Sequence, residues 1–144
     1  VIEKTDENCA IQGIEGSPGT HGFAVQADGD FYCLTPRPGI LDRAMSHVPE
    51  PLRLLHATIC RHLIIRPLIG EFGKILDHVS FVVNPAEVNA IVESGDCQLA
   101  VYLPPFDMKQ LMDAVETGEV LPHKSTYFYP KLVTGLVIYR YNVK

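Results

Sequence analysis

The side chains best suited to chemistry are gathered in one segment near the carboxyl end, residues 122–131. The ammonium groups of Lys124 and Lys131, with the hydroxyls of Ser125 and Thr126, can hold a phosphate or a carboxylate. Three aromatic rings in the same segment could wall a pocket or meet a partner: Tyr127, Phe128 and Tyr129. In the alternative interpretation, the rings anchor a crossover connection to a sheet and the lysines are solvated. No glycine-rich P-loop precedes the hydroxyls.

The spacing of histidine and cysteine residues gives weaker evidence for a metal site or a catalytic thiol. His56 and Cys60 are four residues apart on a predicted helix, and His62 follows closely. A zinc site needs three or four converging ligands, and no H-E-x-x-H or C-x-x-C pattern supplies them, so we predict no metal site and no evident cofactor. Cys33 and Cys97 fall on predicted strands, where a buried thiol is usually inert. No catalytic set stands out.

Hydrophobic periodicity predicts the elements that position these residues. Asp28-Gly29 between two β-rich runs predicts a hairpin over residues 23–34, because a tight two-residue turn requires positive φ at both positions. Asn84-Pro85 marks a helix start. The expected elements are strands at 23–25 and 31–34, a helix at 51–65, a strand at 78–83, a helix at 85–95, a strand at 98–103 taken as central, a helix at 106–117 and a strand at 136–141.

The resulting order, β-β-α-β-α-β-α-β, predicts an α+β fold. We expect a mixed sheet of about five strands with about three helices packed on it. In the helix at 106–117, the apolar residues are expected to face inward: Met108, Leu111, Met112 and Val115. Residues 1–20 are polar and glycine-rich, so we predict a loop or mobile entry, with 21–144 as a single domain.

Composition limits the classes of function. The 144 residues carry a formal net charge of -5, which opposes binding to nucleic acid. Four widely spaced cysteines predict free thiols in a reducing, cytoplasmic compartment. No apolar run reaches the roughly 20 residues of a membrane span. The first residue is Val1 rather than methionine, which indicates an upstream region. The exposed edge of the hairpin could pair with a second copy to form a homodimer.

Residues 118–131 resemble a known terminal signature. The run Gly-Glu-Val-Leu-Pro-His-Lys-Ser-Thr-Tyr-Phe-Tyr-Pro-Lys is similar to the G-E-x-M-P-x-K-S-T-Y-F-Y-P-K-L pattern of the domain of unknown function 1015 family. Residues 63–70 are similar to that family's L-I-L-x-P-L-L-G stretch. The likeness extends over about residues 50–140. Where the family commonly has Asp and His ahead of this stretch, the chain has His56 and Arg61.

The resemblance implies a carboxy-terminal accessory domain. Full-length members carry an upstream D-G-H-H-R-Y type motif similar to the ParB-like fold of some nucleotide-dependent enzymes, including free-serine kinases. We therefore expect this domain to complete a phosphate or anion site of a longer protein, with a nucleotide as the possible cofactor there. The alternatives are a phosphotransfer enzyme acting on a small metabolite such as a free amino acid, and a ParB-like DNA-associated protein, which the net charge opposes.

Overall fold

The computed structural model describes residues 1–15, 22–70, 73–105, 107–121 and 125. The described strands are β1 (Ile2–Thr5), β2 (Phe23–Ala27), β3 (Asp30–Leu34) and β4 (Leu99–Tyr102). The described helices are α1 (Glu7–Glu15), α2 (Ile40–Ala44), α3 (Glu50–Arg53), α4 (His56–Cys60), the π-helix η1 (Arg61–Ile65), α5 (Arg66–Ile69), the 3-10 helix η2 (Ile75–Asp77), α6 (Pro85–Glu93) and α7 (Met108–Glu116).

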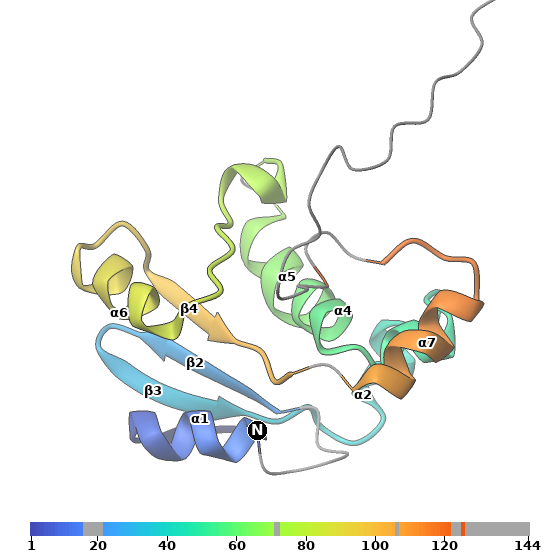
Figure 1. Ribbon diagram of the computed structural model, residues 1–144, viewed down its shortest axis with the longest axis horizontal. Coiled ribbons are helices and arrows are strands. Elements are labelled where there is room, and N and C mark those ends of the chain that lie inside the picture. Colours follow the sequence, from blue (N-terminus) through green and yellow to red (C-terminus); the bar gives the residue numbers. More distant parts are fainter. Residues whose placement is uncertain (16–21, 71–72, 106, 122–124, 126–144) are drawn as a thin grey trace, which may run out of the picture.

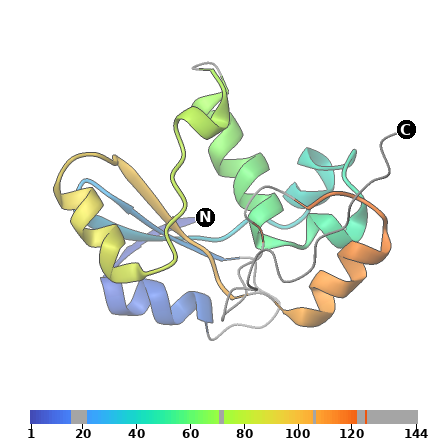
Figure 2. The ribbon, with the colours of Figure 1, turned by 45° about the horizontal axis from the view of Figure 1, so that its top comes forward.

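The predicted α+β class is confirmed, but the sheet differs from the expected one. The described strands form a four-stranded sheet in the order β1-β3-β2-β4, and every ladder in it is antiparallel rather than mixed. The sheet, with α1 and α6, lies on one side of the molecule, and α2, α4, α5 and α7 lie on the other (Figure 1). Figure 2 shows the same division from another angle. The predicted strand at 136–141 lies outside the described residues.

The hairpin prediction is confirmed in detail. Ala27 pairs with Asp30 at the end of the β2–β3 ladder. The two residues between them, Asp28 and Gly29, have φ angles of 51° and 80°. These positive values are the reason for the Asp-Gly sequence, because glycine adopts them freely and aspartate tolerates them.

The predicted loop at the amino end is wrong for residues 2–15. Strand β1 pairs with β3 from Ile2↔Leu34 to Thr5↔Phe31. The Asp6 carboxylate accepts a hydrogen bond from the Cys9 backbone N–H at 2.8 Å and so caps α1. The local composition of residues 2–5 does not predict a strand, because the stability of β1 comes from pairing with β3, which lies far along the chain.

The predicted helix at 51–65 forms in two parts. Helix α3 stops after Arg53, and Leu55 takes an extended conformation with ψ 125° before α4 begins. From α4 the chain stays helical through η1 and α5 to Ile69. Pro67 therefore lies inside a helix that continues beyond its predicted end at residue 65. The helix accommodates a residue without an N–H by widening the preceding turn, where the Arg66 N–H donates to the carbonyl oxygen of Arg61.

The later elements match the predictions in part. Helices α6 and α7 form, and the Asp107 side chain caps α7 by accepting from the Lys109 N–H at 2.9 Å. The predicted strand at 78–83 is wrong, because the described backbone there is irregular and Phe81–Val83 is exposed. Strand β4 forms, but it lies at an edge of the described sheet rather than at its centre.

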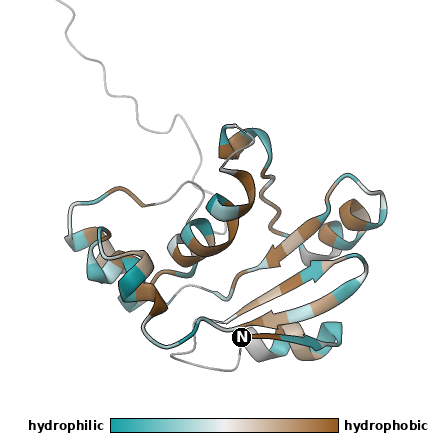
Figure 3. Ribbon diagram, turned by 180° about the vertical axis from the view of Figure 1, so that it is seen from behind, coloured by the Kyte–Doolittle hydropathy of each residue, from teal (hydrophilic) through white to brown (hydrophobic). Residues whose placement is uncertain are grey.

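Apolar side chains fill both faces of β2. Phe23 packs with Met45, Ile59 and Cys60, whereas its neighbour Ala24 packs with Ala10 and Phe31 on the α1 side. Much of the α4–η1–α5 helix is correspondingly apolar (Figure 3).

A third cluster joins α3, α4 and α7 through Leu52, Leu55 and Ala114. In α7 only part of the expected inward face is buried: Leu111 is covered, whereas Met108, Met112 and Val115 are exposed. No helix in the described part of the chain is both long and apolar enough to cross a membrane.

Candidate functional site

Most of the predicted site residues lie outside the described residues: Lys124, Thr126, Tyr127, Phe128, Tyr129 and Lys131. Ser125 is described, and it is buried with 7% of its surface exposed. Their grouping into one anion site therefore stays a prediction.

A different set of cationic side chains comes together on the helix α4–η1–α5. Arg61 and His62 begin the π-turn, and Arg66 follows it. In an α-helix, residues five apart point about 140° away from each other, because a turn holds 3.6 residues. The wider π-turn brings residues five apart onto one side. Pro67 therefore aligns Arg66 with Arg61.

A fourth cationic group reaches this face from another element. His47 follows α2, and its ring centroid lies 5.4 Å from that of His62, with the two planes tilted by 54°. His47, Arg61 and Arg66 are exposed, whereas His62 is half-buried. We call His47, Arg61, His62 and Arg66 the cationic face.

The positive charges on the cationic face repel one another, and this repulsion affects the pKa of His62. Burial lowers the pKa of His62 below its ordinary 6.5, and the positive charges of Arg66, His47 and Arg61 lower it further. Each ion pair described in the structure joins residues elsewhere: Lys4 with Asp30, Arg53 with Asp42, and Lys109 with Asp113. Within the described ranges, then, no carboxylate forms an ion pair with the cationic face. An arrangement of this kind favours an anion, since guanidinium groups bind phosphate and carboxylate oxygens in two-pronged pairs.

The pair His56 and Cys60 has a structural role in the described part of the chain. The His56 ring packs edge-on against Phe23 at a centroid distance of 5.8 Å. Burial raises the pKa of the Cys60 thiol to about 12, so this cysteine is a protonated core residue at neutral pH. No three His, Cys, Asp or Glu side chains among the described residues converge into a group that could hold a metal ion.

Only part of the cationic face could be predicted from the sequence. Three basic residues at positions 61, 62 and 66 are visible, but Pro67 predicts a helix end that would separate Arg66 from the other two. The contribution of His47 depends on tertiary packing and has no sequence signal. Comparisons of the chain with protein-family models, curated proteins and solved structures found no match.

Proposed function

We propose that this chain is an accessory domain that binds a small phosphate- or carboxylate-bearing molecule and completes an anion site of a larger protein. The observation that carries the proposal is the cationic face, on which Arg61, His62, Arg66 and His47 gather without a described carboxylate partner. Like charges brought this close repel one another, and a bound anion removes that repulsion.

The openness of the cationic face supports a completing role. Three of its four side chains are exposed, and the two cavities along α3 are lined by other residues. Small-molecule sites usually enclose most of their ligand. A ligand on this face would be covered from one side, so a second surface has to close over it.

The segment 122–131 belongs to the same proposal as a second source of contacts. The side-chain chemistry of Lys124, Ser125, Thr126 and Lys131 suits an anion, and the resemblance to the domain of unknown function 1015 family implies a completing domain. Two lysines and two hydroxyls complement an anion already held by arginines.

Calorimetric titration with pyrophosphate tests the proposal. We expect weak binding to the wild-type chain that falls by about tenfold for each arginine lost in Arg61→Ala and Arg66→Ala, because each removes a charge-assisted hydrogen bond. Arg43→Ala, an exposed arginine of α2, is the matched control. Unchanged binding in the double variant Arg61→Ala/Arg66→Ala would remove the cationic face from the proposal.

Two further experiments test the role of segment 122–131 and the accessory role of the domain. Weaker pyrophosphate binding in Lys124→Ala would support the contribution of segment 122–131, and unchanged binding would remove it. Sustained release of ADP from ATP by this chain alone would contradict an accessory role and favour a phosphotransfer enzyme.

A further inference from the structure

Two adjoining cavities lie along α3, and no residue of the cationic face lines either one. The larger, of about 450 Å³, is bounded by the Thr35–Gly39 segment, α2 and α3. The smaller, of about 210 Å³, continues from α3 to Gln110 and Asp113 on α7. Glu50 and Leu54 line both. We call the two cavities together the α3 groove.

Four apolar side chains line the larger cavity together with five polar or charged ones. Pro36, Pro38 and Leu41 line it beside Leu54, whose surface is 38% exposed. Exposed apolar surface that faces a cavity favours a ligand with an apolar part, because covering it releases water.

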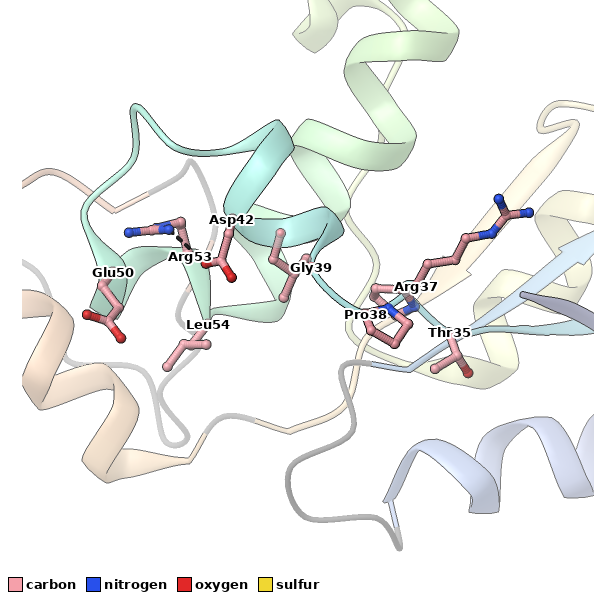
Figure 4. A pocket seen from close by; sticks show the side chains of 10 residues that line it. Thr35, Arg37, Pro38, Gly39, Asp42, Glu50, Arg53 and Leu54 are labelled. Atoms are coloured by element: carbon pink, nitrogen blue, oxygen red, sulfur yellow. Dashed lines mark hydrogen bonds and ion pairs between the residues drawn. The ribbon is translucent and has the colours of Figure 1, made fainter.

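Two charged side chains that line the groove, Arg37 and Glu50, have no ion pair among the described residues. The Arg53 guanidinium, 20% exposed, donates to Asp42 at 2.9 Å. On the α7 side, the Lys109 ammonium contacts Asp113 at 2.6 Å. The Arg37 side chain extends away from the other charged side chains of the cavity (Figure 4). Glu50 has no ion pair among the described residues, and it stands where the two cavities meet.

This arrangement selects the charge of the ligand. Arg53 and Lys109 are paired with Asp42 and Asp113, and Arg37 points away from them, so the unpaired charge beside α3 is the negative charge of Glu50. Asp42 is 83% exposed and holds Arg53 through one oxygen, so its remaining lone pairs can accept from a ligand as well. A cationic group on an apolar stem is complementary to Glu50 above Leu54.

We infer that the α3 groove is a docking site for an extended peptide segment in which a lysine or arginine follows an apolar residue. The apolar side chain fills the larger cavity between Pro38 and Leu41, and the basic side chain reaches Glu50. A peptide fits better than a compact amine because the two cavities continue one another from the Thr35–Gly39 segment to α7. This inference is independent of the proposed anion site.

Chemical-shift titration of the isotope-labelled chain with the acetylated, amidated tripeptide Leu-Lys-Leu tests the inference. We expect weak binding, with shifts at residues 35–41 and 50–54. The same peptide with an acetylated lysine should bind about fivefold more weakly, as should the unmodified peptide to Glu50→Gln, because each change removes one exposed ion pair. Glu93→Gln, an exposed acid at the end of α6, is the matched control and should leave binding unchanged.

Other occupants of the groove give different results. Equal binding of the charged and acetylated peptides, or equal binding to wild type and Glu50→Gln, would overturn the inference. Butylamine binding as tightly as the peptide would assign the groove to small amines instead. A concentration-dependent dimer that Glu50→Gln weakens would assign it to a second copy of the chain. Either of these last two results would also overturn the peptide assignment.

Discussion

The cationic face and the α3 groove lie on neighbouring helices and differ in whether their basic side chains form ion pairs. Along the groove, Arg53 and Lys109 are each matched by a carboxylate, and a single acid, Glu50, is left over. On the cationic face, two arginines and two histidines stand together without a described carboxylate partner. The sign of the charge in each region therefore follows from which of its side chains form ion pairs. The overall charge of -5 predicts neither region.

The largest effect is expected from a buried residue between α3, which lines the groove, and α4, which leads into the cationic face. Leu55 is fully buried where α3 meets α4, in the cluster that also includes Ala114 of α7. Leu55→Ala should lower the free energy of unfolding by about 2–5 kcal/mol, because it leaves a cavity between both helices. Urea denaturation measures this change, with the exposed Leu68→Ala as control. A loss below about 1 kcal/mol would mean that the two regions are stabilised separately.

A smaller effect is expected from the residue that shapes the cationic face. Pro67→Ala restores an N–H, so the preceding turn can return to α-helical bonding and Arg61 turns away from Arg66. Pyrophosphate binding should weaken by about tenfold while the free energy of unfolding stays the same or rises. Peptide binding in the α3 groove should not change.

Pro51→Ala provides the matched control for that comparison. Pro51 stands in the first turn of α3, where proline is tolerated without a wider turn. Equal loss of anion binding in both proline variants would show that the π-turn is not what aligns the arginines.

The smallest expected effect is the pH dependence of the cationic face. The pKa of His62 is lowered by burial and by its cationic neighbours, and a bound anion opposes that shift. Sulfate, whose charge is constant in this range, should bind about threefold more tightly at pH 5.5 than at pH 7.5. His62→Asn should flatten the profile, and peptide binding in the groove supplies a comparison without His62. Equal sulfate affinity at both pH values would remove His62 from the site.

The lowered pKa of His62 also determines how the stability of the folded chain changes with pH when no anion is bound. Because the folded pKa of His62 lies below the ordinary value of 6.5, the unfolded chain takes up the proton first as the pH falls. The contribution of His62 to stability is therefore fully present above pH 6.5 and decreases as the pH falls through that value. Added sulfate should offset this decrease.

Local signals in the sequence predicted the elements that depend on local chemistry. The Asp28-Gly29 hairpin and the helix start at Asn84-Pro85 were predicted because these residues favour the backbone conformations that they adopt there. Strand β1 was missed because its stability comes from a partner far along the chain.

For the candidate site, the sequence indicated the right chemistry in a segment that the structure mostly does not describe. The cationic face itself depends on a helix that continues through Pro67 and on a loop that brings in His47. Periodicity assumes a regular helix, so it cannot foresee a turn whose widening changes which residues share a face.

The first residue of the chain has a practical consequence for anyone attaching a label to it. The Val1 ammonium donates to the Thr35 carbonyl at 2.7 Å, and the Thr35 N–H donates back to Val1 at 3.0 Å. Because β1 runs antiparallel to β3, any residue joined ahead of Val1 is directed along Pro36 and Arg37, which line the larger cavity. A fluorophore or affinity tag fused there would report on the α3 groove or obstruct it, whereas one carried by the exposed Cys9 thiol on α1 would begin on the side of the sheet that α1 covers.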